Sequence, residues 1–207
     1  MRIFSEHSPS GTRRFGLEFG RRPAPPRRTL VLGGARSGKS VTAEAMMTGR
    51  QDVLYVATGG SRDGDEDWAQ RVGLHRDRRP AAWGTAETCA LEPLLAEPGG
   101  PLLIDCLALW LTSVMDDCDA WDDAAWAGHG RDRLRTRTAA LVEAWRTTPR
   151  RVVAVSNEVG SGVVPATVSG RRFRDELGRL NAAVASASDD VLLVVAGQAL
   201  PLKGPGR

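Results

Sequence analysis

The eight residues GGARSGKS, from Gly33 to Ser40, constrain the fold of this chain more than any other stretch. They match the pattern G-x-x-x-x-G-K-S, follow an apolar run from Thr29 to Leu32 that predicts a buried strand, and precede a helical pattern from Val41 to Met47. The chain has only two lysines, and one of them, Lys39, stands where the pattern requires it, which disfavours an ordinary glycine-rich turn. The stretch therefore predicts a phosphate-binding loop between a strand and a helix.

The rest of the chain alternates short apolar runs with helical patterns. Runs rich in β-branched residues recur at 53–57, 102–106, 152–156 and 191–196, and helical patterns lie between them at 65–79, 131–146 and 170–187. This alternation predicts an α/β fold of the P-loop NTPase-like (RecA-like) kind, with a mostly parallel sheet flanked by helices. Residues 116–130 have no clear period and predict a loop or a poorly packed helix, with His129 on the surface.

Composition and charge predict one domain preceded by a tail. Residues 1–28 hold seven arginines against Glu6 and Glu18, a balance of +5, so the remaining residues carry 3 − 5 = −2. Because the tail is also rich in Pro, Gly and Ser, we expect it to be disordered and residues 29–207 to form a single domain. The small net charge of residues 29–207 argues against a nucleic-acid partner. No apolar run is long enough for a signal peptide or a membrane span.

The three cysteines predict a reducing environment. Cys89, Cys106 and Cys118 are too widely spaced for a CxxC-type metal site, and an odd number cannot all pair within one chain. We expect buried or idle thiols and a cytoplasmic protein.

The phosphate loop implies both a nucleotide and a metal ion. Its glycines allow backbone N–H groups to turn toward a polyphosphate, Lys39 can reach the β and γ phosphates, and the Ser40 hydroxyl can ligate Mg²⁺. Asp105 ends the apolar run PLLIDC, the placement of a Walker B carboxylate, and is the second candidate metal ligand. The predicted nucleotide-binding residues of the loop are Gly33, Gly34, Ala35, Arg36, Ser37, Gly38, Lys39 and Ser40.

The stretch RVGLHRDRRP places His75 among arginines. Asp67, Arg71, His75 and Arg79 are spaced by four and would share one face of a helix that Pro80 ends. Such a face is usually solvated. Beside a nucleotide site, however, clustered guanidiniums can keep the imidazole neutral and nucleophilic and can bind the phosphate that it attacks.

Three functions are compatible with these features. One is an enzyme in which His75 acts as a nucleophile beside the phosphate loop. The second is a single-function P-loop kinase acting on another small alcohol, and the third is a nucleotide-dependent switch. Neither of the last two gives a reason for a histidine among arginines.

Taken in order, the motifs of this chain resemble a known family, the bifunctional adenosylcobinamide kinases and adenosylcobinamide-phosphate guanylyltransferases of cobalamin biosynthesis. The resemblance runs from about Thr29 to Lys203. The motifs that carry it are GGARSGKS, LYVAT, RVGLHRDRRPAAWGTAE, LLIDCLALWLTSVM, VSNEVGSGVVP, RRFRDELGRLNAAVA and VLLVVAGQALPLK.

The resemblance implies two reactions on one scaffold. ATP or GTP phosphorylates adenosylcobinamide with Mg²⁺, and GMP then passes from GTP through a covalent guanylyl-histidine, here His75, to give adenosylcobinamide-GDP. It also implies a homotrimer and further guanine nucleotide contacts at Ala57, Thr58, Gly59, Arg76, Asp77, Arg78, Arg79, Glu87 and Asp105.

The chain departs from the family at a few positions. Asp67 and Trp68 stand where the family usually has Glu-Met, Leu74 occupies a variable position, and Asp105 stands where some members have Glu. Glu158, after the run that ends in Asn157, either orients the substrate hydroxyl or the metal, or has a helix-capping or loop-stabilising role.

Overall fold

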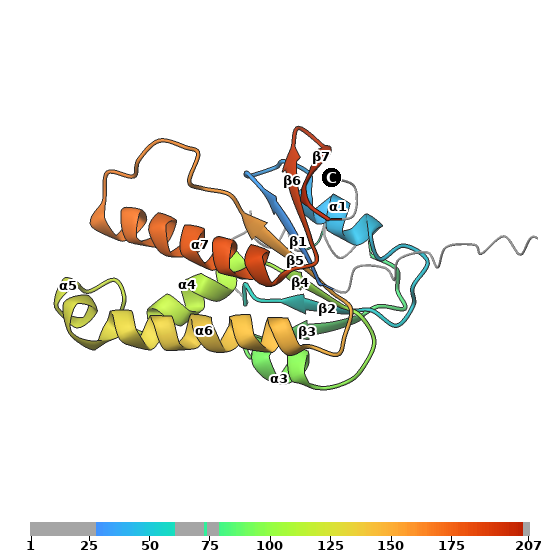
Figure 1. The fold of residues 1–207 in the computed structure, drawn as a ribbon, viewed down its shortest axis with the longest axis horizontal. Helices are drawn as coiled ribbons and strands as arrows, with labels where there is room; N and C mark the ends of the chain where they lie inside the picture. The colour runs from blue at the N-terminus through green and yellow to red at the C-terminus, as the bar shows by residue number, and fades with distance from the viewer. Residues whose placement is uncertain (1–27, 61–72, 74–78, 205–207) are drawn as a thin grey trace, which may run out of the picture.

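Seven strands form one sheet in the computed structural model, which describes residues 28–60, 73 and 79–204 (Figure 1). The sheet order is β3-β2-β4-β5-β1-β6-β7, and every neighbouring pair is parallel except β6 and β7. This confirms the predicted α/β fold with a mostly parallel sheet. The strands are β1 (Arg28–Gly33), β2 (Leu54–Ala57), β3 (Gly84–Glu87), β4 (Leu102–Asp105), β5 (Val152–Asn157), β6 (Asp190–Val195) and β7 (Gln198–Lys203).

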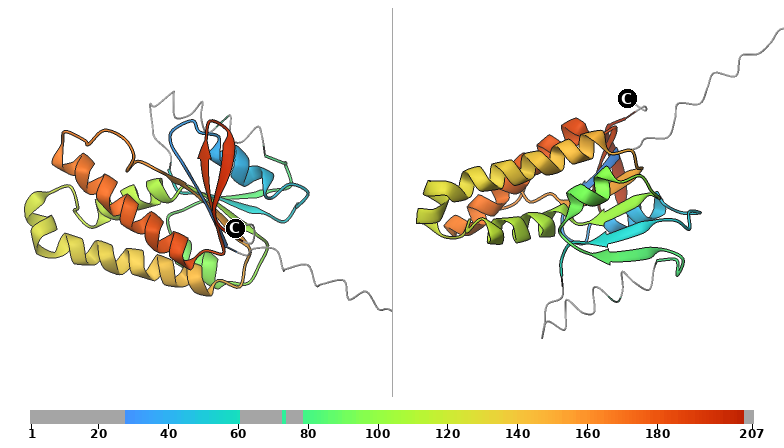
Figure 2. Two further views of the ribbon diagram at one scale, coloured as in Figure 1. Left: turned by 45° about the horizontal axis from the view of Figure 1, so that its top comes forward. Right: turned by 90° about the horizontal axis from the view of Figure 1, so that it is seen from below.

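Helices cover both faces of the sheet. In Figures 1 and 2, α4, α6 and α7 lie together on one face and α1 lies on the other. Among the helices of the described part of the chain, none is both long and apolar enough to span a membrane. The helices are α1 (Lys39–Ala45), α3 (Leu91–Ala96), α4 (Leu107–Asp117), α5 (Asp123–Ala125), the single π-helical turn η1 (Trp126–Gly130), α6 (Arg131–Thr147) and α7 (Val168–Ala187).

The central strands are buried on both faces, as their continuous apolar runs predict. All residues of β5 except the last are buried, and Leu30, Val31 and Ile104 are fully inaccessible. Because both faces of these strands need a cover, the layers of helices follow from the composition of the strands. The predicted helix at 65–79 falls mainly outside the described residues.

Residues 116–130 join the end of α4 to α6, and most of them are exposed. Residues 118–122 form a turn after α4, and the short α5 and the single turn η1 lead from there into α6, so the predicted loop or poorly packed helix is confirmed. Trp126 is buried, and the guanidinium groups of Arg172 and Arg131 lie 4.8 and 5.4 Å from the centre of its ring. The ring of Trp126 thus lies between the start of α6 and α7. The His129 side chain is exposed, as expected.

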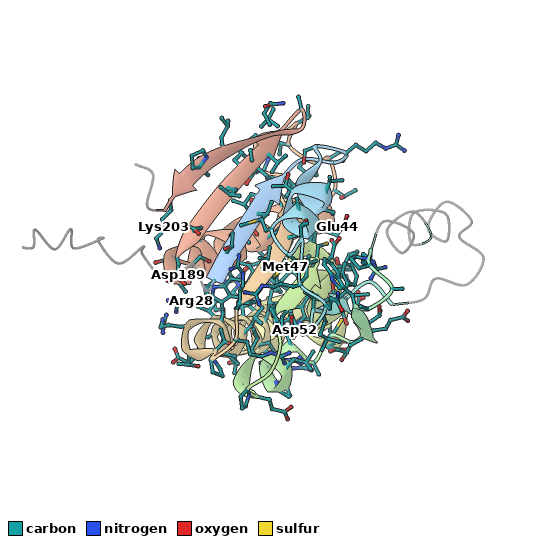
Figure 3. All side chains as sticks on the ribbon, turned by 90° about the vertical axis from the view of Figure 1, so that its right-hand side faces the viewer. Arg28, Glu44, Met47, Asp52, Asp189 and Lys203 are labelled. Carbon is teal, nitrogen blue, oxygen red and sulfur yellow. The ribbon has the colours of Figure 1, made fainter. Side chains whose placement is uncertain are left out.

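Polar contacts at the amino end of the sheet join β1 to β6. Arg28 Nε and Nη2 donate to the two carboxylate oxygens of Asp189 at 3.0 and 2.7 Å, and the Arg28 backbone N–H also donates to Asp189 (Figure 3). A bidentate pair of this geometry fixes the register in which β6 joins the sheet. These contacts lie at the opposite edge from the phosphate loop, which follows the carboxyl end of β1.

Candidate nucleotide and phosphoryl-transfer site

The loop from Gly33 to Ser40 joins β1 to α1, as the sequence predicts. Arg36 and Gly38 adopt left-handed backbone conformations, with φ of 56° and 96°. Gly33 has no room for a side chain, since a Cβ there would lie 2.4 Å from Ser37 Oγ and 2.7 Å from the backbone oxygen of Val194. The loop is therefore wound too tightly for a larger residue at its first position.

Two distant segments fasten this loop. The Gly197 N–H, in the turn between β6 and β7, donates to Ser37 O at 2.8 Å. The Glu158 N–H, just after β5, donates to Gly33 O at 3.0 Å. The loop is thus held from the strands on both sides of β1, which keeps its backbone in one shape before a ligand arrives.

Lys39 folds back over the loop. Its Nζ donates to Gly34 O at 3.0 Å. Burial lowers the pKa of Lys39, and the neighbouring Cys106 and Asp105 act in the opposite direction. Ser37 Oγ is buried and has no hydrogen-bond partner among the described residues. The loop thus contains a cation and a buried hydroxyl, groups that suit a phosphate ligand.

Asp105 ends β4 and lies within the electrostatic reach of Lys39. One of its carboxylate oxygens, Oδ2, accepts a hydrogen bond of 3.0 Å from Tyr55 Oη. The backbone around it is fixed by Thr58, whose hydroxyl donates to Cys106 O at 2.7 Å and accepts from Cys106 N at 3.0 Å. The hydroxyl of Thr58 is thus used to hold the ends of β2 and β4 together. Burial raises the pKa of the Cys106 thiol to about 11.

The sheet brings three of the predicted nucleotide residues into one row. Ala57 of β2 pairs with Glu87 of β3 on one side and with Asp105 of β4 on the other. Glu87 is exposed, and Gly59 follows Ala57 by two residues. Because these strands are parallel, their carboxyl ends form one edge, where ligands of doubly wound sheets bind.

Arg79 is the described residue nearest to His75 on its carboxyl side. Its guanidinium lies 3.7 Å from the centre of the Tyr55 ring. The other predicted residues of that stretch, His75, Arg76, Asp77 and Arg78, lie outside the described residues, as do Asp67 and Arg71.

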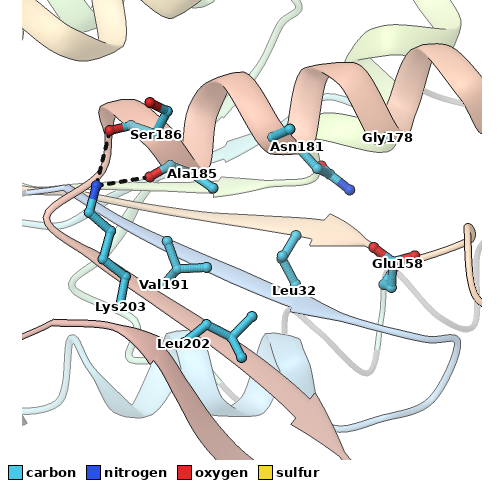
Figure 4. A pocket seen from close by; sticks show the side chains of 10 residues that line it. Leu32, Glu158, Gly178, Asn181, Ala185, Ser186, Val191, Leu202 and Lys203 are labelled. Atoms are coloured by element: carbon cyan, nitrogen blue, oxygen red, sulfur yellow. Dashed lines mark hydrogen bonds between the residues drawn. The ribbon is translucent and has the colours of Figure 1, made fainter. Parts of the chain in front are cut away.

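Glu158 uses its side chain within its own loop. Its Oε1 accepts the Gly160 N–H at 2.7 Å, the loop-stabilising contact that the sequence left as one of two alternatives. The residue also lines a groove of about 540 Å³ between α7 and strands β1, β6 and β7 (Figure 4). At the other end of that groove, Lys203 Nζ donates to the carbonyl oxygens of Ala185 and Ser186 at the end of α7.

The oxygen donors near the loop fit Mg²⁺. Ser40 is the second residue of α1, directly after the loop, and Asp105 ends β4 within electrostatic reach of Lys39, so one hydroxyl and one carboxylate belong to the segments around the loop. The described residues hold no group of three or more His, Cys, Asp or Glu side chains that could bind a metal ion. Mg²⁺ in nucleotide enzymes is held by one or two protein oxygens together with phosphate oxygens and water, which is the set available here.

Sequence reasoning missed two residues of this site. Tyr55, the only tyrosine of the chain, stands in an apolar strand. Nothing in the sequence indicates a role for its hydroxyl, because the hydrogen bond to Asp105 joins two strands that are far apart along the chain. Gly197 was missed because it reaches the loop from a hairpin that was not predicted. The three cysteines are free, with Cys106 and Cys118 buried and Cys89 half-buried.

Comparison with known proteins gives consistent matches. The family model described as cobinamide kinase / cobinamide phosphate guanyltransferase matches residues 29–202. The chain is 43% identical over 182 residues to the bifunctional adenosylcobalamin biosynthesis protein CobP of Pseudomonas aeruginosa, covering 86% of this chain and 98% of that protein. It is 39% identical over 184 residues to the bifunctional adenosylcobalamin biosynthesis protein CobU of Salmonella typhimurium, covering 84% of this chain and 98% of that protein.

A solved structure supports the fold alone. An ATPase from the type III secretion system of pathogenic bacteria matches with a TM-score of 0.50 and 11% identity, over 84% of this chain. This chain spans 56% of that structure. The likeness agrees with the RecA-like arrangement of the sheet and the phosphate loop.

Proposed function

The chain belongs to the cobinamide kinase / cobinamide phosphate guanyltransferase family, and on that basis we propose how its residues divide the two reactions of cobalamin biosynthesis. As a member of this family, the chain is a bifunctional cobinamide kinase and guanylyltransferase, with ATP and GTP as substrates. The observation that carries the residue assignment is the phosphate loop itself, with Lys39 within the electrostatic reach of the Asp105 carboxylate at the carboxyl edge of the sheet.

The kinase step belongs to the phosphate loop. Lys39 moves from Gly34 O to the β and γ phosphates, where its charge stabilises the negative charge that develops on the transferred phosphoryl group. Ser40 and Asp105 are the residues that would hold Mg²⁺, and the ion would neutralise phosphate charge when bound. The acceptor is the hydroxyl of the aminopropanol arm of adenosylcobinamide.

The guanylyl step belongs to His75. An imidazole nitrogen attacks the α phosphate of GTP, a P–N bond forms, and the bond to the β phosphate breaks to release pyrophosphate. The phosphate of the phosphorylated corrinoid then attacks the same phosphorus, the P–N bond breaks, and adenosylcobinamide-GDP leaves. The guanine nucleotide is bound by two groups of residues, those that follow His75 and those at the ends of β2 and β3: Arg76, Asp77, Arg78 and Arg79, and Ala57, Thr58, Gly59 and Glu87. The resemblance in sequence supports these roles.

Intact-mass measurement tests the division of roles. After incubation with GTP and Mg²⁺, the protein is expected to gain the mass of one GMP through an acid-labile bond. His75→Ala is expected to lose this adduct and the guanylyl transfer while it retains phosphorylation of cobinamide. Lys39→Ala is the matched variant, and we expect it to lose most of the phosphorylation activity. An adduct on another residue, or guanylyl transfer at the wild-type rate in His75→Ala, would show that His75 lies on a solvated basic face.

We further infer a cytoplasmic homotrimer that acts on a corrinoid. The three free thiols suit a reducing compartment, and Val195, Leu200 and Leu202 leave exposed apolar surface on the β6–β7 hairpin. Sedimentation at the mass of three chains would support the trimer, and a monomer at micromolar concentration would contradict it.

A further inference from the structure

We propose that Tyr55 is a positioning residue that holds both the carboxylate of Asp105 and the guanidinium of Arg79 in place. Its hydroxyl fixes the rotation of the Asp105 carboxylate, and its ring seats Arg79. This inference rests on the proposed function, because it takes Asp105 as a metal ligand and His75 as the guanylylated residue.

The register of the sheet places Tyr55 beside Asp105. Tyr55 of β2 pairs with Leu103 of β4, and Asp105 stands two residues further along the same strand. Residues two apart in a strand point to the same face, so the tyrosine side chain runs along β4 toward the carboxylate. The resulting hydrogen bond, from Tyr55 Oη to Asp105 Oδ2, is 3.0 Å long.

The hydroxyl of Tyr55 acts as a hydrogen-bond donor. Only 5% of the residue is exposed. The hydroxyl lies 3.0 Å from Asp105 Oδ2, and because a carboxylate oxygen only accepts, the phenol O–H is the donor. A tyrosine that keeps its proton donates to the carboxylate and restricts how its plane can turn. In many metal sites, a hydrogen bond that holds a ligating carboxylate in one orientation raises the affinity for the metal ion.

The ring of Tyr55 serves a second contact. The Arg79 guanidinium lies 3.7 Å from its centre, within the range of a cation–π interaction. Arg79 stands four residues after His75 in the sequence. One aromatic side chain therefore touches the carboxylate of the kinase site and the arginine that ends the histidine segment. A phenylalanine would fill the same space and seat Arg79 equally well, which makes the hydroxyl separable by experiment.

The test measures metal-dependent binding as well as activity. The dissociation constant of a non-hydrolysable ATP analogue is measured by calorimetry with Mg²⁺ and with EDTA, for wild type and Tyr55→Phe. We expect the gain in affinity that Mg²⁺ gives to fall about tenfold in Tyr55→Phe, while the affinity in EDTA stays at the wild-type value. We also expect phosphorylation of cobinamide to need about tenfold more Mg²⁺ and to recover at high Mg²⁺.

Two further variants separate the hydroxyl from the ring and from general stability. Tyr55→Leu removes both contacts, so we expect it to slow formation of the GMP adduct at saturating Mg²⁺, where Tyr55→Phe forms it at the wild-type rate. Ser188→Ala is the matched control. It removes another buried hydroxyl, one that accepts from Trp145 Nε1 at 3.1 Å at the amino end of the sheet, and should leave the Mg²⁺ dependence unchanged.

The outcomes are distinguishable. A wild-type ratio of the two dissociation constants in Tyr55→Phe overturns the proposal, even if both activities of the wild-type enzyme are present. Absence of the GMP adduct or of phosphorylation in the wild-type enzyme instead contradicts the proposed division of roles. Because the ratio is internal to each variant and is measured below its melting temperature, a loss of stability in Tyr55→Phe does not hide the result.

Discussion

Replacing Gly33 by alanine tests whether the phosphate loop is as tightly wound as the structure shows. The added Cβ would lie 2.7 Å from Val194 O, about 0.3 Å inside the 3.0 Å limit that Cβ atoms essentially never cross. Ser37 Oγ, at 2.4 Å, can rotate away, but Ser37 Cβ remains at 3.2 Å. The Val194 carbonyl belongs to β6, which pairs with β1 at this position, and so cannot yield without disturbing the sheet.

The overlap is expected to lower the free energy of unfolding by a measurable amount. Inserting a methyl group into a filled site costs about 2 kcal/mol, which lowers the melting temperature of a domain of this size by about 6 °C. If the loop moves to relieve the overlap, the energy appears instead as weaker binding of the nucleotide. The assay is therefore a thermal melt combined with an ATP titration of the same variant.

Gly34→Ala is the matched control, since a Cβ there meets no atom within 4 Å. We expect this variant to melt within about 1 °C of the wild type, as a surface substitution does. The reasoning is refuted if Gly33→Ala keeps both the wild-type melting temperature and the wild-type affinity for ATP. It is also refuted if Gly34→Ala loses as much stability as Gly33→Ala.

Two further predictions concern the tail and a buried acid. Removing residues 1–26 is expected to leave both activities and the melting temperature nearly unchanged, because the composition of the tail predicts no packing, and a large drop in melting temperature would contradict this. Burial, and then the charge of Asp189, raise the pKa of Asp190 above 3.8, with Arg151 acting in the opposite direction. The ionised form of Asp190 therefore costs stability, a cost that is absent below pH 3.8, grows as pH rises toward the folded-state pKa, and is constant above it. Asp190→Asn is thus expected to raise the melting temperature more at neutral pH than in acid, and an equal effect at both pH values would contradict the reasoning.

The sequence predicted the elements whose own residues show a clear apolar run or a helical period. The strands with long apolar runs are largely buried, so their residues alone predict strands in the interior of a sheet: β1, β2, β4, β5 and β6. β7 was missed because all of its residues are exposed and it contains Pro201, which a strand tolerates at an edge. The short β3 has no buried residue to mark it, and α4 begins two residues after the apolar strand β4, so no turn residues separate the two elements in the sequence.

The site was predictable where a local motif defines it. The loop around Lys39 and the carboxylate of Asp105 both follow recognisable strands, and the structure places them together. Tyr55 and Gly197 act through contacts between segments far apart in the sequence, and no local pattern records such contacts. The order of the strands, which brings Glu87, Ala57 and Asp105 into one row, likewise depends on long-range pairing.

The bond from Gly197 to Ser37 has a consequence for synthesis on the ribosome. The phosphate loop is translated early, but one of its two fastenings comes from a hairpin near the other end of the chain. At ordinary translation rates of about 5–20 residues per second, the loop waits on the order of ten seconds for that partner. A nascent chain halted after β5 and before the β6–β7 turn therefore holds its phosphate loop by only one of the two bonds, the one from Glu158 to Gly33.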